Sequence, residues 1–227
     1  MTGILASVAS LKEASALASL PIDILDLKNP ALGALGALEL KDVHRIVETF
    51  PDLCISATVG DLPMVPEVIG RAVDAMAEAG VDYVKIGFFD SGDWQPVLDQ
   101  LKPVADRGVK LVAVLFADQA FSLSVLPAFK AAGFEGIMVD TADKTRGGLL
   151  AYRELSWLEG FVQVGRSLGC LTGLAGSLSL GDIPKLKPLG ADYLGFRGAL
   201  CAESRTGALD LSSAIRVCAA MAARDRS

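Results

Sequence analysis

The sequence is poor in the residues that most metal sites and nucleophilic triads need. It has one histidine, His44, and its four cysteines show no CxxC spacing. A zinc site needs a cluster of His or Cys ligands, and a Ser-His-Asp triad would depend on His44 alone, inside a predicted helix. We therefore expect no metal, and reduced, buried thiols in a cytoplasmic protein, at Cys54, Cys170, Cys201 and Cys218.

Long apolar runs and basic stripes are also missing. No hydrophobic run approaches the ~20 residues of a membrane-spanning helix, and the stretch 1–10 is too short for a signal peptide. The net charge is −6, with a sequence pI of about 4.8. We therefore expect neither a membrane nor a nucleic acid as partner, although basic residues that converge locally can still bind phosphate.

The chain is rich in hydrophobic residues, at 52%, and has 23 glycines among 227 residues. This is enough to bury one large core, so we expect a single domain over residues 1–227. A sequence motif recurs in which a helix ends at glycine, a small or acidic residue follows, and a strand begins. Because glycine suits the left-handed position that closes a helix, this motif is typical of alternating helices and strands. Its copies lie at 78–87, 132–140 and 189–198, with weaker copies at 107–116 and 168–176.

This alternation predicts a compact (β/α)8 TIM barrel. The alternative is a doubly wound open sheet, but no GxGxxG follows the first strand. Strands are expected at 3–8, 22–28, 53–58, 82–87, 110–116, 135–140, 171–176 and 192–197. Helices are expected from Ser10, over 40–49, 66–80, 93–106 and 122–132, from a capping box at 156–159, over 179–189 and from 210 to about 224.

The stretch 22–30 reads as a buried strand that ends abruptly in charge. Pro30 stops the strand, and Asp26 and Lys28 are two residues apart, so they point to the same side. A carboxylate and an ammonium on an otherwise apolar strand are costly to desolvate unless they are paired or used. Two interpretations follow: a structural ion pair, or a lysine made reactive at the mouth of a barrel.

More charged residues lie where other strands end, and in (β/α)8 barrels the active site lies at the carboxyl ends of the strands. The predicted fourth strand ends near Lys85, and the sixth ends in Asp140, with Lys144 shortly after it. We expect these residues to meet Asp26 and Lys28 at one mouth. A purely structural pair between Lys85 and Asp140 is the alternative.

This set of residues favours chemistry on a carbonyl group. A lysine attacks a carbonyl only as the neutral amine, and its free pKa is about 10.4. Burial and a neighbouring cation both lower that pKa, and Lys28 and Lys85 would do this to each other. Asp26 and Asp140 would orient the amines or move protons. With neither metal ligands nor a histidine in reach, we expect Schiff-base chemistry that needs no cofactor.

The loops after the seventh and eighth strands predict a phosphate site. They carry Gly176, Ser177, Arg197 and Gly198. Barrels often bind phosphate at this point through backbone N–H groups, and a guanidinium suits phosphate because it binds in a bidentate manner. The alternative is that the glycines serve only tight packing.

Several motifs together resemble those of the (5-formylfuran-3-yl)methyl phosphate synthase family, also called 4-(hydroxymethyl)-2-furancarboxaldehyde-phosphate synthases. The first is Asp-Leu-Lys-Asn-Pro at 26–30, followed by Gly-Ala-Leu-Gly-Ala at 33–37. The second is Tyr-Val-Lys-Ile-Gly at 83–87. The resemblance spans nearly the whole chain, and further matching motifs lie at 140–144, 175–178 and 195–198.

The resemblance implies a (β/α)8 lyase that joins two glyceraldehyde 3-phosphates into a furan aldehyde phosphate, an early step to methanofuran and thus part of one-carbon metabolism. By this resemblance, Lys28 forms the Schiff base and Lys85 donates and accepts protons. Asp26, Asp140 and Lys144 would assist. We expect a carbon–oxygen lyase acting on phosphates, with a small phosphorylated substrate, and a homo-oligomer.

Two other functions fit the same residues. One is a different class I aldolase, which would share the lysine chemistry but retain both phosphates. The other is a sugar-phosphate-binding barrel without catalysis. Product analysis separates the first from a furan synthase, and ligand binding without turnover would indicate the second.

Overall fold

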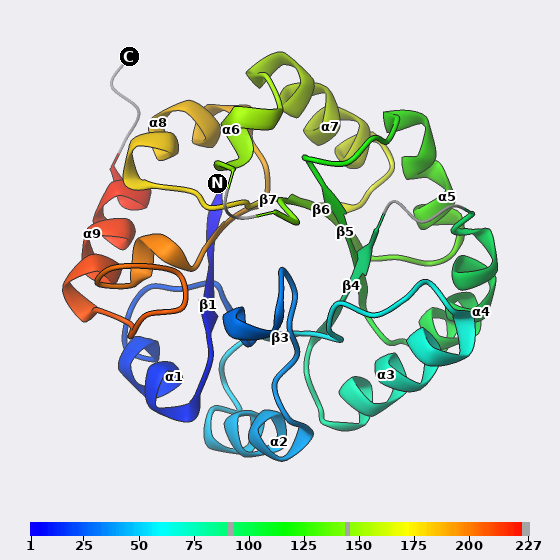
Figure 1. Ribbon diagram of the computed structural model, residues 1–227, viewed down its shortest axis with the longest axis horizontal. Helices are drawn as coiled ribbons and strands as arrows, with labels where there is room; N and C mark the ends of the chain where they lie inside the picture. The colour runs from blue at the N-terminus through cyan, green and yellow to red at the C-terminus, as the bar shows by residue number, and fades with distance from the viewer. Residues whose placement is uncertain (90–92, 144–145, 224–227) are drawn as a thin grey trace.

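The computed structural model describes residues 1–89, 93–143 and 146–223, and its strands close into a parallel barrel (Figure 1). Each strand pairs with the next in the sequence, and β8 pairs with β1, so the sheet has no free edge. This order confirms the predicted (β/α)8 barrel. The strands are β1 (Gly3–Val8), β2 (Ile24–Leu27), β3 (Ile55–Thr58), β4 (Tyr83–Phe88), β5 (Leu111–Phe116), β6 (Gly136–Asp140), β7 (Leu171–Leu174) and β8 (Tyr193–Phe196).

Helices surround the barrel and cover the outer face of the sheet (Figure 1). Within the described part of the chain, none of them is both long and apolar enough to cross a membrane. They are α1 (Leu11–Leu17), α2 (Leu40–Thr49), α3 (Pro66–Glu78), α4 (Gln95–Asp106), α5 (Leu126–Ala131), α6 (Leu149–Tyr152), α7 (Leu155–Ser167), α8 (Ile183–Leu186) and α9 (Leu211–Ala222).

Three helix predictions need correction. The stretch expected as one helix over 122–132 begins with a 3₁₀ turn at Leu123–Val125, and α5 follows it. The capping box expected at Ser156 does not start a helix, because α7 already begins after Glu154, which makes no side-chain cap. The helix expected over 179–189 is divided into α8 and a 3₁₀ turn on either side. Pro184 and Pro188 lack the N–H donor that would continue the preceding turn, so each lies at the start of a new one.

The acidic residue of the recurring motif connects neighbouring strands at their amino ends by a hydrogen bond. The carboxylates of Asp82 and Asp192 each accept a hydrogen bond at 2.7 Å from an N–H at the start of the preceding strand, β3 or β7. Asp23 does the same for β1, also at 2.7 Å. These N–H groups would otherwise lack a partner at the rim of the sheet. The amino end of the barrel is thereby closed by structural contacts.

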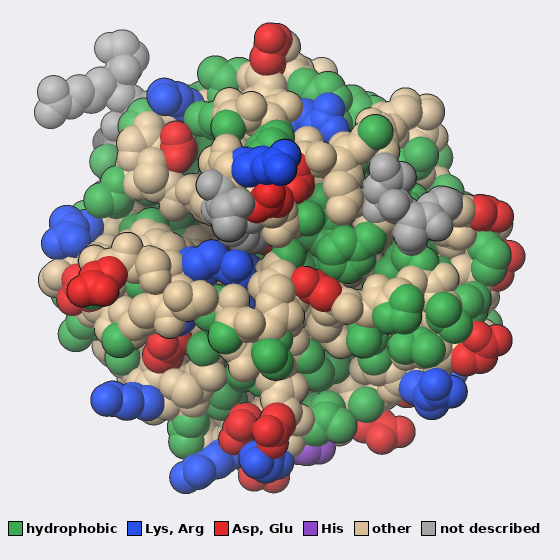
Figure 2. All heavy atoms as spheres, viewed as in Figure 1, with side chains coloured by type: hydrophobic (Ala, Val, Ile, Leu, Met, Phe, Trp, Pro, Cys, Tyr) green, Lys and Arg blue, Asp and Glu red, His purple; other side chains and the backbone are tan. Residues whose placement is uncertain are grey.

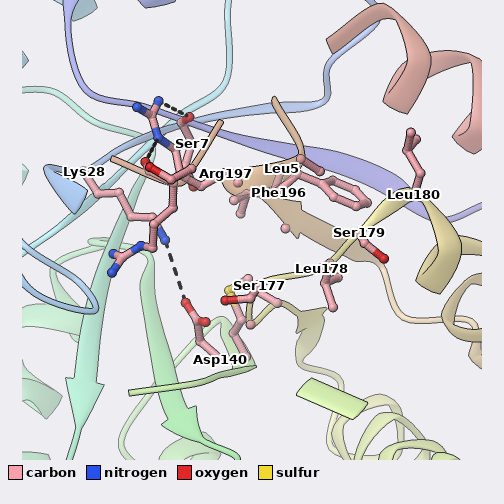
Figure 3. Close-up of a pocket in the computed structure, with 18 of the residues that line it drawn as sticks. Leu5, Ser7, Lys28, Asp140, Ser177, Leu178, Ser179, Leu180, Phe196 and Arg197 are labelled. Atoms are coloured by element: carbon pink, nitrogen blue, oxygen red, sulfur yellow. Dashed lines mark hydrogen bonds and ion pairs between the residues drawn. The ribbon is translucent and has the colours of Figure 1, made fainter. Parts of the chain in front are cut away.

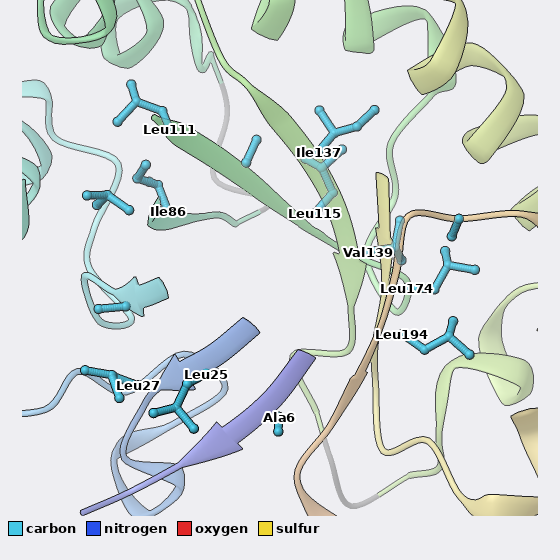
Figure 4. Close-up of a cluster of buried hydrophobic side chains, with 14 of the residues drawn as sticks. Ala6, Leu25, Leu27, Ile86, Leu111, Leu115, Ile137, Val139, Leu174 and Leu194 are labelled. Carbon is cyan, nitrogen blue, oxygen red and sulfur yellow. The ribbon is translucent and has the colours of Figure 1, made fainter. Parts of the chain in front are cut away.

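The core has two parts, which reflects the alternation of side chains along each strand. The larger part lies between strands and helices, where Leu27, Ile86 and Leu194 are fully buried (Figure 4). The smaller part fills the barrel interior and includes Leu5, Met138 and other residues. Because both faces of the sheet are covered, the strands are apolar almost throughout, as parallel sheets require.

The loop after β2 folds inward and closes part of the mouth. Leu35 is fully buried and joins the interior cluster. Asp61, in the loop after β3, accepts hydrogen bonds at 2.7 Å from the N–H groups of Ala34 and Leu35. A Cβ on Gly87 would lie 2.8 Å from the Leu35 side chain, so a larger residue at position 87 would force that side chain to shift. The loop is therefore held from two sides.

Candidate active site

A buried lysine–aspartate pair lies inside the barrel. The Nζ of Lys85 on β4 lies 2.9 Å from Oδ1 of Asp26 on β2, and these side chains are 2% and 0% exposed. Asp26 also accepts hydrogen bonds from the hydroxyls of Ser7, at 2.8 Å, and Ser56, at 2.7 Å. The two serines stand in register with Asp26 on the neighbouring strands β1 and β3. Three other strands therefore direct polar side chains at one carboxylate.

A second pair lies nearer the ends of the strands. Lys28 follows β2, and its Nζ lies 3.8 Å from Oδ2 of Asp140, the last residue of β6 (Figure 3). The other oxygen of Asp140 accepts a hydrogen bond at 2.7 Å from the N–H of Thr141, which orients the carboxylate. Both side chains are buried, at 8% and 4% exposure. Lys144, the remaining candidate on this side, lies outside the described residues.

The two buried ion pairs combine the four charged residues differently from the structural pairs that the sequence suggested. A structural pair of Asp26 with Lys28, or of Lys85 with Asp140, is not what forms. Lys85 lies in the middle of β4 and not at its end, because the strand continues to pair with β5 through Phe88. Lys85 is therefore placed deep enough to reach Asp26, while Lys28 is left for Asp140.

The electrostatics of Asp26 favour its ionised form. Complete burial acts to raise the pKa of the carboxyl, but the charges of Lys85 and Lys28 and the hydrogen bonds from Lys85 and Ser56 outweigh it. The pKa of Asp26 is therefore lowered from its ordinary value of 3.8. A carboxylate that stays ionised inside a barrel keeps a positive partner beside it, which holds Lys85 in place.

This pKa shift predicts how stability depends on pH. A lowered folded-state pKa stabilises the protein fully above pH 3.8 and progressively less as the pH falls below it. We expect Asp26→Asn to lower the free energy of unfolding by about 3–5 kcal/mol at neutral pH, because it leaves Lys85 unpaired. Urea unfolding should show that this difference is constant above about pH 5 and shrinks by roughly 1.4 kcal/mol per unit below pH 4.

The matched control is Asp74→Asn. Asp74 pairs with Arg107 at 2.7 Å on the outer surface, and both side chains are about half exposed, at 48% and 59%. An exposed pair of this kind contributes about 0–1 kcal/mol, so its removal should change unfolding little at any pH. If the free energy of unfolding depended on pH in the same way for wild type and Asp26→Asn, the Asp26 carboxylate would not be stabilising.

One cavity of about 490 Å³ opens above the two pairs. This volume is typical of sites for small ligands. Lys28, Lys85 and Asp140 line the cavity, whereas Asp26 lies beneath it, hydrogen-bonded to Lys85. In the space-filling view, Lys and Arg side chains reach the surface near the centre of this face (Figure 2). The predicted phosphate-site residues line the same cavity: Gly176, Ser177, Arg197 and Gly198.

The loop after β7 contributes Gly176 and Ser177 to the lining of this cavity. Ser177 has a φ of 49°, which makes it the single non-glycine with a left-handed backbone among the described residues, and Gly176 has a φ of 114°. A Cβ on Gly176 would also lie 3.0 Å from the side chain of Thr141. Within the described part of the chain, the N–H groups of Gly176, Ser177 and Gly198 make no hydrogen bond. Unpaired N–H groups at strained backbone are a common device for binding anions.

Arg197 lines the cavity, but its guanidinium is already engaged. It pairs with both carboxylate oxygens of Glu13, at 2.5 and 3.2 Å, and it donates to the carbonyls of Ser7, Arg205 and Gly207. These contacts use all five N–H donors of an arginine. Figure 3 shows the guanidinium beside Ser7 and far from Asp140 in the view. Direct contact of Arg197 with phosphate remains a prediction.

Sequence reasoning missed two residues of the site. Ser7 supports Asp26, and the signal was a lone hydroxyl in the otherwise apolar run 3–8. Arg205 lines the cavity from the loop after β8. Its signal was an arginine among small, turn-forming residues in a loop long enough to reach back over the mouth.

The fold and the site together define a (β/α)8-barrel protein with two buried lysine–aspartate pairs, of which Lys28, Lys85 and Asp140 line one cavity. Residues 4–217 match the family described as 4-HFC-P synthase, and the chain belongs to this family of enzymes. The resemblance seen in the motifs is thereby confirmed.

Curated relatives agree with this assignment, and a solved structure shares the fold. The chain is 35% identical over 191 residues to (5-formylfuran-3-yl)methyl phosphate synthase of Methanothermobacter thermautotrophicus, covering 79% of this chain and 80% of the relative. It is 36% identical over 192 residues to the enzyme of the same name from Methanocaldococcus jannaschii, covering 79% and 81%. Its fold is similar to 3-hexulose-6-phosphate synthase from Salmonella typhimurium, with a TM-score of 0.71 at 17% identity over 97% of this chain and 98% of the other.

Proposed function

We propose that this protein condenses two molecules of glyceraldehyde 3-phosphate into (5-formylfuran-3-yl)methyl phosphate, for methanofuran biosynthesis. The observation that carries the proposal is the presence of two buried lysines, Lys28 and Lys85, each beside its own carboxylate and both lining one cavity. One lysine is needed to hold a carbonyl carbon as an imine, and another group is needed to move protons. The curated relatives that carry this name support the choice of reaction.

In the proposed reaction, Lys28 forms an imine with one triose phosphate and releases water. Loss of a proton from the imine gives an enamine, whose carbon attacks the aldehyde of the second triose phosphate. Lys85, with Asp26, Asp140 or Lys144, moves the protons that accompany loss of one phosphate and of water. Ring closure and hydrolysis of the imine return the free Lys28 amine. Formation of the aromatic furan makes the sequence effectively irreversible.

The phosphate groups are proposed to lie against the loops after β7 and β8. Gly176, Ser177 and Gly198 line the same cavity as Lys28, and within the described residues their N–H groups make no hydrogen bond. A phosphate bound to such N–H groups would hold the carbon chain in reach of the amine. Apolar side chains such as Leu5 and Phe196 line another part of the cavity and limit water.

The whole reaction is tested by its stoichiometry. Two triose phosphates minus one phosphate and two waters leave the furan aldehyde phosphate. We expect the protein, incubated with glyceraldehyde 3-phosphate and without added metal, nicotinamide or flavin, to release one phosphate for each new ultraviolet-absorbing product. Phosphate release and absorbance, recorded together with mass analysis of the product, check this ratio.

Other products would favour other functions. An aldol product that retains both phosphates would replace this proposal with a class I aldolase. Binding of the triose phosphate without any turnover would favour a non-catalytic barrel. A requirement for an added metal ion would also contradict the proposed chemistry.

A further inference from the structure

The loop between β8 and α9 forms a small hairpin that carries Arg205 near its tip. Cys201 and Leu209 make an antiparallel bridge at its base. Near the tip, the N–H of Gly207 donates to the carbonyl of Ser204 at 2.9 Å. A hairpin closed by backbone hydrogen bonds presents its tip residue in a defined direction.

Arg197 fixes that direction. Its Nε donates to the carbonyl of Arg205 at 2.8 Å, and its Nη2 donates to that of Gly207 at 3.1 Å. Because Arg197 is itself held by Glu13 on α1, the tip of the hairpin is fastened to the barrel. The Arg205 side chain lines the cavity, and its Nη2 reaches the carbonyl of Gly33 in the loop after β2, at 2.8 Å.

The guanidinium of Arg205 is incompletely satisfied. Among the described residues, its one hydrogen bond goes to Gly33, and no carboxylate lies within ion-pair distance of it. Burial lowers the pKa of Arg205, and the more distant charges of Asp140 and Asp61 act in the opposite sense without outweighing it. A half-buried cation with four of its five N–H donors still available is arranged to receive an anion.

We propose that Arg205 binds the phosphate of the substrate, and that this contact makes the enzyme select phosphorylated over unphosphorylated aldehydes. The proposal rests on the function proposed above, since it assigns a ligand within the same cavity. Arg205 lines the same cavity as Gly176, Ser177 and Gly198, whose N–H groups make no hydrogen bond among the described residues, so a phosphate there would have both a cation and backbone donors. Arg197 then acts as a positioning residue, because its own donors are used.

The hydrogen bond from Arg205 to Gly33 places a phosphate bound by Arg205 close to Lys28. Gly33 belongs to the loop that begins just after Lys28 and is held by Asp61 at its next two residues. Arg205 can bind a phosphate through its remaining N–H groups without releasing Gly33. The bound phosphate would therefore be fixed relative to the loop that follows Lys28, and so near the amine that forms the imine.

The direct test measures binding of inorganic phosphate by calorimetry, with no turnover involved. We expect Arg205→Gln to weaken phosphate binding roughly 10- to 100-fold, the loss typical of one hydrogen-bonded charged partner. Arg205→Lys keeps the charge without the bidentate geometry and should fall between that variant and wild type. Arg107→Gln, on the outer surface beside Asp74, is the matched control and should bind phosphate as wild type does.

Unchanged phosphate affinity in a folded Arg205→Gln would overturn the proposal. If Arg197→Lys lost phosphate affinity and Arg205→Gln did not, phosphate binding would be assigned to Arg197. No binding of phosphate to wild type at millimolar concentration would overturn it as well. If Arg205→Gln fails to fold, Arg205→Lys decides the question, with weakened binding in support and unchanged binding against.

A second measurement separates this inference from the proposed reaction. Borohydride trapping on wild type is compared for glyceraldehyde 3-phosphate and for glyceraldehyde. Arg205→Gln should reduce the preference for the phosphorylated aldehyde, taken as the ratio of the two trapping rates, roughly 10- to 100-fold. A preference equal to that of wild type would refute the role of Arg205. Absence of trapping in every variant would refute the imine chemistry instead, and the calorimetric result on phosphate would then stand by itself.

Discussion

Borohydride reduction in the presence of glyceraldehyde 3-phosphate is expected to leave a stable adduct on Lys28. The Lys28 amine follows the end of β2, lines the cavity and lies 3.8 Å from the Asp140 carboxylate, which can exchange protons with it. Reduction converts the imine into a secondary amine that survives digestion, so peptide mass analysis identifies the modified residue. This is the largest effect we predict, because the whole reaction depends on that bond.

Lys28→Arg tests the assignment while keeping the charge. A guanidinium can still pair with Asp140, so we expect the protein to fold, but it cannot form the imine. Activity should fall on the order of 10⁴-fold or more, as when a covalent nucleophile is removed. Lys102→Arg is a matched control, since Lys102 pairs with Asp106 on an exposed face of α4. An adduct found on Lys85, and still formed in Lys28→Arg, would overturn the assignment.

The second large effect is expected at Lys85. We propose that Lys85 moves protons after the imine has formed, so Lys85→Met should lower the rate of furan formation by about 10²–10⁴-fold. Trapping of the triose phosphate on Lys28 should persist, because the imine is formed on the other lysine. A rate near that of wild type in this variant would remove Lys85 from the mechanism.

The buried pair adds a stability effect that has to be measured separately. Lys85→Met leaves the Asp26 carboxylate buried without its cation, which typically lowers the free energy of unfolding by about 3–5 kcal/mol. The double variant Asp26→Asn with Lys85→Met removes both charges of this pair and should regain most of that stability. Urea unfolding of the wild type and the three variants gives the coupling between the two residues. If furan formation recovered along with stability, the role of Lys85 would be structural.

The positions of the strands could be predicted because their signals are local. Apolar runs bounded by glycine and an acidic residue occur within about ten residues, and the carboxylates of Asp82 and Asp192 satisfy N–H groups of the preceding strand. The gathering of charged residues on one side of the barrel could also be predicted, since the carboxyl ends of parallel strands meet on that side. Lys28, Lys85 and Asp140 therefore met as expected.

The partner of each charged residue could not be predicted in the same way. The choice of Asp26 for Lys85 depends on how far β4 continues and on the register of β1, β2 and β3. The guanidinium of Arg197 meets Glu13, which lies 184 positions earlier in the chain, because closure brings β8 beside β1. The ion pair with Glu13 uses N–H donors of Arg197 that the sequence analysis had assigned to phosphate.

The sequence by itself determined the alternation of strands and helices, the closed (β/α)8 architecture and the group of residues at the mouth. These follow from hydrophobic patterning, turn residues and the rule for strand ends, all of which act over short stretches of chain. Only the tertiary structure decided that Lys85 pairs with Asp26, that Lys28 pairs with Asp140, and that Arg205 is the arginine with donors to spare. The physical reason is that a hydrogen bond or ion pair depends on distance in space, and the barrel brings together side chains from strands and loops that are far apart in the sequence.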